Sequence, residues 1–318
     1  MNIRTALSCL GLALAMLPAS TFAQYPNKPI RLIVPFAAGG PTDSVARTVA
    51  QAISKGLGQA VLVENRPGAD GAIAAQSVIT AAPDGYTLFF TTSSVLALQI
   101  VAKPPPFDAE RDFAPVCGIG RFAFAMYANP SVPARTLREL LAYARANPGK
   151  LNYATVNVGE QFAAAHVMRS GGFDMVRVPY KGYAQLMPDL LENRVQVYFG
   201  PMAAGLQQVK EGKLRMLATF LGERSAAMPD VPTLAEAGLP ALEVQGLQMI
   251  LAPVKTPADI VQRLSREAMT ALQDPALRAA LEKHVFVVDG STPQKLADDI
   301  VESNRLYSAF VRDSRFSQ

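Results

Sequence analysis

Cysteine, histidine and tryptophan are nearly missing from this sequence. Its 318 residues include two cysteines, two histidines and no tryptophan. Cys9 falls in an N-terminal apolar stretch, and Cys117 lies in an apolar context that suits a buried thiol better than a nucleophile. Neither His166 nor His284 has a His or Cys partner at the spacing of a zinc site. We therefore expect no metal and, in a chain without the N-terminal stretch, no internal disulfide.

The sequence also lacks a hydrophobic run long enough to cross a membrane. Its N-terminal apolar stretch, residues 6–17, follows Arg4 and ends at Pro18, and it is shorter than the roughly 20 apolar residues of a spanning helix. Thr21 and Ala23 then provide the small residues typical of a signal-peptide cleavage site. We therefore expect residues 1–23 to be a signal peptide and the exported, mature protein to begin after Ala23.

Charge is sparse and nearly balanced. Charged residues make up 18% of the chain, and 30 Lys and Arg face 26 Asp and Glu, with no dense basic run. Nucleic acid is therefore not an expected partner. The Gly-x-Ser-x-Gly elbow of hydrolases, the Walker loop and the dinucleotide-binding glycine pattern are absent from the sequence. These absences argue against an enzyme and against a cofactor.

What the chain does contain is a repeated strand–turn–helix pattern. Residues 30–34 are apolar and β-branched and end at the Gly39-Gly40 turn, after which Val45, Val49 and Ile53 recur at helical spacing. A weaker copy of the pattern occupies residues 61–91. Alternation of this kind predicts α/β architecture, with parallel-type sheets flanked by helices.

The pattern divides the chain into two lobes. An apolar strand over residues 121–128 leads into a second α/β set, and a strand over residues 242–251 leads back. We expect residues 24–124 and 242–318 to form one lobe and residues 125–241 the other. The two crossing strands would then act as a hinge.

Several predicted strands end in turns suited to an anionic ligand, which open α/β sheets bind at the carboxyl ends of their strands. Gly39 and Gly40 precede a helix whose N-terminal N–H groups and dipole favour an anion, although a tight turn alone would also explain them. Asp43 either caps that helix or bonds a ligand hydroxyl or water. Four hydroxyls over residues 91–94 are either carboxylate donors or helix caps. Residues 180–182 add an aromatic ring, a glycine turn and a cation that is either a ligand partner or a solvated surface lysine.

Ordered motifs along both predicted lobes carry a resemblance to a known family. They are Val34-Pro35-Phe36 with Gly39-Gly40 and Asp43, Val63-Glu64-Asn65-Arg66-Pro67-Gly68-Ala69, Pro83-Asp84-Gly85-Tyr86-Thr87-Leu88, Asp112-Phe113-Ala114-Pro115, Val178-Pro179-Tyr180-Lys181-Gly182, and residues 229–238. The chain resembles the Bug family, the extracytoplasmic solute-binding receptors of tripartite tricarboxylate transporters. The resemblance implies a two-lobed periplasmic-binding-protein (Venus flytrap) fold, a periplasmic location and a monomer.

The resemblance further implies that a small carboxylate is bound between the lobes, largely by backbone groups and ordered water, and is passed to the membrane components of the transporter. The expected loops are those at residues 36–43 and 91–94 on one lobe and 155–161 and 180–182 on the other. Together with a strand-end glycine, they give the candidate ligand-binding residues Phe36, Ala38, Gly39, Gly40, Thr42, Asp43, Thr91, Thr92, Ser93, Asn157, Gly159, Glu160, Gln161, Tyr180, Lys181, Gly182 and Gly200.

Three departures from the family pattern put its usual ligand in doubt. Glu160 adds a negative charge near the expected pocket and Phe162 adds bulk, where the family usually has a Ser- and Gly-rich stretch. Leu247 stands where a Trp is common. A periplasmic sensor remains the alternative to a transport receptor, and an enzyme on the same scaffold is a third reading that the missing motifs disfavour. The identity of the ligand does not follow from the sequence.

Overall fold

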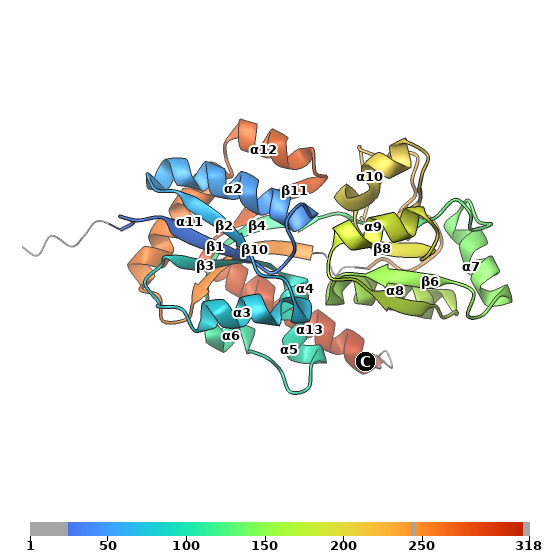
Figure 1. The fold of residues 1–318 in the computed structure, drawn as a ribbon, viewed down its shortest axis with the longest axis horizontal. Helices are drawn as coiled ribbons and strands as arrows, with labels where there is room; N and C mark the ends of the chain where they lie inside the picture. The colour runs from blue at the N-terminus through green and yellow to red at the C-terminus, as the bar shows by residue number, and fades with distance from the viewer. Residues whose placement is uncertain (1–24, 243–245, 314–318) are drawn as a thin grey trace, which may run out of the picture.

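The chain folds around two β-sheets, which Figure 1 shows side by side. The structure is a computed structural model that describes residues 25–242 and 246–313. The predicted signal peptide lies outside these residues. One sheet has the strand order β11-β4-β10-β3-β1-β2 and the other β7-β6-β8-β5-β9. We call the part around the six-stranded sheet lobe 1 and the part around the five-stranded sheet lobe 2.

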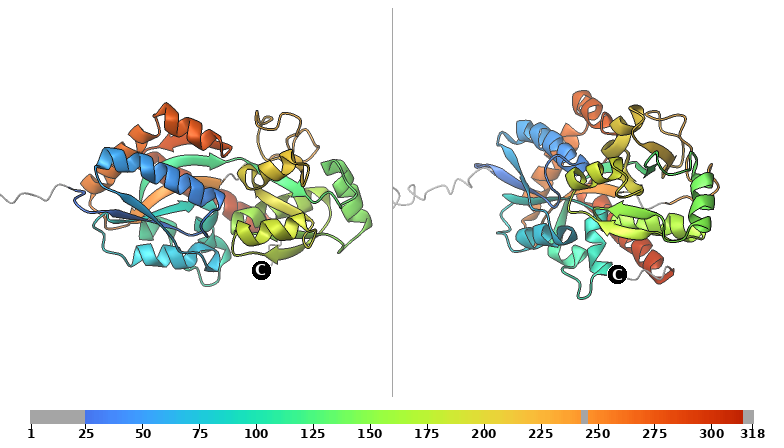
Figure 2. Two further views of the ribbon diagram at one scale, coloured as in Figure 1. Left: turned by 45° about the horizontal axis from the view of Figure 1, so that its top comes forward. Right: turned by 45° about the vertical axis from the view of Figure 1, so that its right-hand side comes forward.

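Lobe 1 is formed by both ends of the described chain. Its elements are β1 (Ile30–Val34), α2 (Pro41–Leu57), β2 (Val61–Asn65), η2 (Ala69–Gly71), α3 (Ala72–Ile79), β3 (Thr87–Thr92), α4 (Ser93–Leu96), α5 (Leu98–Val101), α6 (Ala109–Asp112), β4 (Phe113–Phe122), β10 (Gly246–Pro253), α11 (Ala258–Ala271), α12 (Pro275–Glu282), β11 (Phe286–Ser291) and α13 (Pro293–Asp313). Helices α2 and α11 cover one face of the sheet and α3 and α13 the other (Figures 1 and 2).

The sheet of lobe 1 is mixed. Strand β1 pairs in parallel with β2 and β3, as the repeated strand–helix pattern predicts. Strand β10 runs antiparallel to both β3 and β4, because β4 carries the chain toward lobe 2 and β10 carries it back. Strand β11, which the sequence pattern did not reveal, adds an antiparallel edge beside β4.

Helix α2 shows how the local sequence sets an element that positions the cleft. Pro41 occupies its first turn, where the missing N–H of proline leaves no helical bond unmade. Val45, Val49 and Ile53 lie on its buried face at helical spacing. The helix ends at Gly58, whose φ of 65° is the left-handed conformation that favours glycine.

Lobe 2 repeats the α/β arrangement in the middle of the chain. Its elements are β5 (Phe124–Ala128), α7 (Leu137–Ala146), β6 (Asn152–Thr155), α8 (Val158–Gly171), β7 (Val176–Pro179), α9 (Tyr183–Leu191), β8 (Val197–Pro201), α10 (Met202–Lys210) and β9 (Arg215–Thr219). Strand β6 is parallel to β7 and β8, whereas β5 is antiparallel to β8 and β9.

The chain passes between the lobes twice. The first passage is at Ala123, between β4 and β5, so the second sheet already begins at Phe124. The described chain returns to lobe 1 with β10. The predicted two-lobed α/β plan with two crossings therefore matches the structure.

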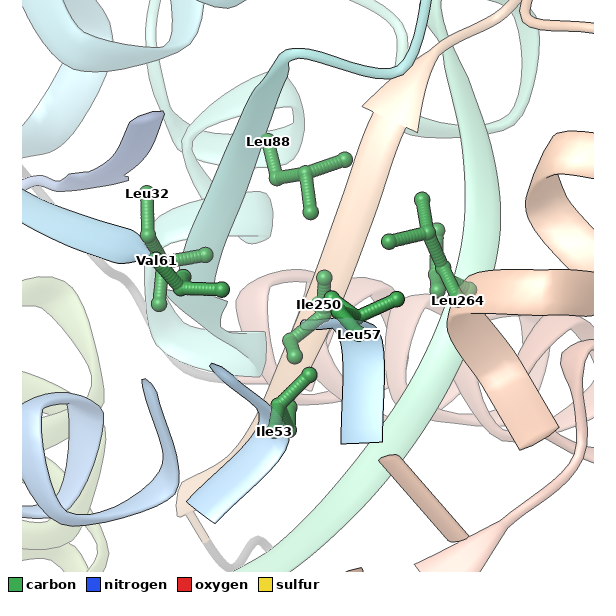
Figure 3. A pocket seen from close by; sticks show the side chains of 8 residues that line it. Leu32, Ile53, Leu57, Val61, Leu88, Ile250 and Leu264 are labelled. Carbon is green, nitrogen blue, oxygen red and sulfur yellow. The ribbon is translucent and has the colours of Figure 1, made fainter. Parts of the chain in front are cut away.

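A small void in the core of lobe 1 is a packing gap (Figure 3). Its volume is about 10 Å³. Its lining is entirely aliphatic: Leu32, Ile53, Leu57, Val61, Leu88, Val116, Ile250 and Leu264. A water molecule there would find no hydrogen-bonding partner, so the void carries no site.

Candidate ligand-binding cleft

A cleft of about 700 Å³ lies between the two lobes. Lobe 1 contributes residues 35–37, after β1, and residues 67–71, after β2. Lobe 2 contributes Val156, after β6, together with residues 179–182 and 184–185, at the end of β7 and the start of α9. The lining thus follows strand ends, as expected of an α/β ligand site, and the volume suits a small molecule.

The predicted ligand-binding residues divide into two groups. The cleft lining includes Phe36, Tyr180, Lys181 and Gly182. The remaining predicted residues lie outside that lining: Ala38, Gly39, Gly40, Thr42, Asp43, Thr91, Thr92, Ser93, Asn157, Gly159, Glu160, Gln161 and Gly200. Ligand contact stays a prediction for both groups, but the structure shows what each side chain already does.

Within the lining, a hydrogen bond holds the Tyr180 side chain in place, whereas the Lys181 ammonium has no partner among the described residues. The Tyr180 hydroxyl donates a 2.8 Å hydrogen bond to Asp189 Oδ2. Lys181 is exposed, and among the described residues its ammonium forms no ion pair or hydrogen bond. An anionic group entering the cleft would therefore meet a cation that no protein carboxylate neutralises.

Asp43 organises the turn that follows β1. Its carboxylate is 3% exposed and accepts hydrogen bonds from Gly39 N at 2.9 Å, Arg47 Nε at 3.0 Å and Asn65 Nδ2 at 2.8 Å. Burial raises the pKa of Asp43, but these hydrogen bonds outweigh it and lower that pKa overall. The Gly39 N–H, predicted to bind the ligand carboxylate, is instead donated to Asp43, because that carboxylate needs compensation for burial.

The two glycines of this turn have different roles. Gly39 adopts a φ of 83°, which favours glycine, and has open space around its Cα. Gly40 has an ordinary φ of −80°, but a Cβ there would lie 3.0 Å from Tyr183 Cδ2 of lobe 2. Close approach of the other lobe, rather than backbone conformation, therefore requires the second glycine.

The hydroxyls after β3 act mainly as caps. Thr92 Oγ1 accepts a hydrogen bond from Val95 N at 3.2 Å and lies 2.6 Å from Ser94 Oγ. Ser93 bonds the Tyr307 hydroxyl. Within the part of the chain that the structure describes, the buried Thr91 hydroxyl has no hydrogen-bonding partner. The helix-cap interpretation therefore accounts for Thr92. The Thr91 hydroxyl could still donate a hydrogen bond to a ligand.

Glu160 faces the interior of lobe 2 instead of the cleft. Its Oε1 accepts hydrogen bonds from Tyr183 at 2.8 Å and Tyr198 at 3.0 Å, and its Oε2 accepts one from Val156 N. Asn157 Oδ1 caps the helix by accepting from Glu160 N at 3.1 Å. Burial raises the pKa of Glu160 to about 7 despite these donors. The two tyrosines hold the carboxylate inside the lobe, next to Val156 of the cleft lining, and contact of Glu160 with a ligand stays a prediction.

Gly159 and Gly200 are also close-packed. A Cβ on Gly159 would lie 2.7 Å from Ser94 Cβ of lobe 1, and one on Gly200 would lie 1.8 Å from the Tyr198 hydroxyl. Both positions therefore exclude a side chain. Phe162, expected to add bulk near the pocket, is fully buried and packs on Tyr307 of α13 with 4.5 Å between ring centroids.

Comparisons with known proteins agree with this geometry. Residues 45–312 match the family model described as the tripartite tricarboxylate transporter family receptor. The chain belongs to that receptor family. BugT of Bordetella pertussis is 35% identical over 303 residues, which cover 92% of this chain and 90% of BugT.

Solved structures resemble this receptor along almost its whole length. The periplasmic binding protein BugD superposes with a TM-score of 0.86 at 28% identity, covering 91% of this chain and 98% of BugD. Rpa4515 of R. palustris, solved with adipate, gives a TM-score of 0.87 at 29% identity and covers 91% and 97% of the two chains. Family and fold are thus those of two-lobed solute-binding proteins, not of enzymes.

The receptor contains a cleft loop, residues 67–71, that was not predicted to bind the ligand. Ala69 and Asp70 have positive φ values of 46° and 52°, and Asp70 is exposed to the cleft. The sequence signal was present, since this loop follows a strand within one of the quoted motifs. Nothing in the local sequence indicates that this loop meets lobe 2, so the loop is absent from the predicted site.

Other chemistry has no assembled site in residues 25–242 and 246–313. No group of three or more His, Cys, Asp or Glu could hold a metal ion there. Cys117 is buried, which raises its pKa to about 12 and disfavours the reactive thiolate. None of the helices in the same residues has the length and apolarity to cross a membrane.

Proposed function

We propose that this receptor captures a small carboxylate between its lobes in the periplasm and delivers it, unchanged, to the membrane components of a tripartite tricarboxylate transporter. The protein acts as a monomer in this scheme. The observation that carries the proposal is the cleft of about 700 Å³, lined by both lobes and containing the unpaired ammonium of Lys181. A ligand that touches both lobes favours their closure.

Lys181 anchors the carboxylate. Hydrogen bonds to charged groups are worth roughly 1.5–3 kcal/mol, more than neutral ones. The fixed Tyr180 ring and the Phe36 ring provide apolar walls for the carbon skeleton. The adipate bound to Rpa4515 supports a carboxylate as the ligand class.

The test is calorimetry on protein freed of any retained ligand, with a panel of mono-, di- and tricarboxylates. Replacing Lys181→Met is expected to weaken the tightest binder by about tenfold or more. Lys150→Met is the matched control. Lys150 is exposed just before β6, whereas the cleft lies beyond the opposite, carboxyl end of that strand. Absence of binding across the whole panel would overturn the proposal.

A further inference from the structure

Two charged groups of opposite sign line the cleft from different lobes. Asp70 comes from lobe 1 and Lys181 from lobe 2, and the rest of the lining is uncharged. Among the described residues, the Asp70 carboxylate accepts no hydrogen bond and forms no ion pair. Arg177 of lobe 2 acts on it only through charge attraction, and its Nε donates to Thr155 Oγ1 at 3.0 Å.

The loop that carries Asp70 is fixed by its neighbours. Gly71 has a φ of 103°, and a Cβ there would lie 2.7 Å from Val95 Cγ1 and 3.2 Å from Pro35 Cβ. The loop is therefore packed directly on lobe 1. Asp70 itself has φ 52° and ψ 23°, a conformation in which Asp and Asn are enriched among residues other than glycine. The carboxylate is thus presented to the cleft by a defined backbone.

The Asp70 carboxylate keeps contact with solvent in the cleft but loses part of its hydration there. This partial desolvation raises the pKa of Asp70, even though the Arg177 charge lowers it. A ligand ammonium would relieve this cost by pairing with Asp70. A second or third ligand carboxylate would instead be repelled by Asp70 and would find no second unpaired cation in the lining.

We propose that the cleft selects a zwitterion, whose carboxylate pairs with Lys181 and whose ammonium group pairs with Asp70. The ligand class is that of amino acids, with an apolar or neutral skeleton between or beside the charges. The inference rests on the proposed function, since it specifies which carboxylates the same cleft accepts. Asp70 then acts as a specificity-determining residue.

The test compares pairs of ligands that differ in a single amino group. Suitable pairs are leucine with 4-methylpentanoate and γ-aminobutyrate with butyrate, titrated by calorimetry into ligand-free protein. Wild-type protein is expected to bind the amino acid of a pair at least tenfold more tightly, and Asp70→Asn to abolish most of that preference. Asparagine tolerates the left-handed backbone, so the loop keeps its shape.

Two further variants separate the roles of the charges. Lys181→Met is expected to weaken both members of a pair, because both carry the carboxylate. Asp174→Asn, at an exposed position just before β7 and outside the cleft lining, is expected to leave the preference unchanged. Tighter binding of the acids that lack the amino group, or a preference that survives Asp70→Asn, overturns the zwitterion inference and leaves carboxylate capture standing. Failure of every ligand to bind overturns both.

Discussion

At the scale of single residues, two carboxylates outside the cleft lining, those of Asp43 and Glu160, hold segments next to the cleft in place. Asp43 fixes the turn after β1 through three donors, and Glu160 fixes the start of α8 through two tyrosine hydroxyls and a backbone N–H. Their environments differ in charge. Arg47 pairs with Asp43 and holds its pKa low, whereas Glu160 has only neutral donors and a raised pKa. Glu160 should therefore gain or lose its proton near neutral pH.

The stability of the protein is expected to depend on pH through Glu160. Its pKa is about 7 in the folded protein and near 4.5 in the unfolded chain, so folding retains a proton between these values. The contribution of the Glu160 proton to the free energy of unfolding is fully present below pH 4.5 and is lost as the pH rises through 7. It amounts to about 3 kcal/mol. Glu160→Gln keeps the size of the side chain but removes its ionisable carboxyl group. Urea unfolding from pH 4.5 to 8 should show a flatter profile for this variant, and identical profiles would contradict the assignment.

At the scale of elements, the lobes meet where helices begin. Gly40 precedes α2 and faces Tyr183 at the start of α9, and Gly159 in the first turn of α8 faces Ser94 of α4. Each of these helices follows the end of a strand. The strand-end rule that places ligands at this edge therefore also places the contacts between the lobes there.

A side chain at Gly40 is expected to hold the lobes apart. Gly40→Thr would place Cβ 3.0 Å from Tyr183 Cδ2 and add two further heavy atoms, while its φ of −80° and ψ of 169° suit threonine. Threonine is also about as good an N-cap as glycine, so α2 should remain intact. Ligand affinity should fall about tenfold or more with an unchanged melting temperature. Gly222→Thr, in open space, is the control, and parental affinity in Gly40→Thr would argue against close approach.

The sequence predicted the elements better than the use of their polar groups. The helical spacing of Val45, Val49 and Ile53 places α2 correctly, and all three side chains are buried there. Composition alone cannot tell that the Gly39 N–H is donated to Asp43 or that Glu160 bonds two tyrosines, because these partners come from tertiary packing. The role of Asp70 was missed for the same reason, since its opposing lobe is assembled only in the fold.

At the scale of the whole molecule, the lobes already touch on one side of the cleft. Helix α13 packs on β4 of lobe 1 and extends beneath α8 of lobe 2 (Figure 1). The Tyr307 ring of α13 packs there on the Phe162 ring of α8. Helices α4 and α8 also lie in contact. In the described residues the chain enters lobe 2 at Ala123 and resumes in lobe 1 with β10. Closure therefore depends on a small set of noncovalent contacts together with the ligand.

We expect ligand binding to close the lobes and the Phe162–Tyr307 contact to favour the closed state. A ligand that contacts both lobes shifts the population toward closure, so the radius of gyration from X-ray scattering should fall at saturation. Phe162→Ala removes the ring that packs on Tyr307 at 4.5 Å, and should give a larger radius without ligand and weaker apparent affinity, because fewer molecules are competent to bind. Phe173→Ala is the control, since Phe173 is a buried ring that follows α8 and, among the described side chains, makes no ring contact with α13. It should lower stability while leaving the ligand-free radius unchanged. A radius that does not change at saturation in the parent protein would contradict hinged closure.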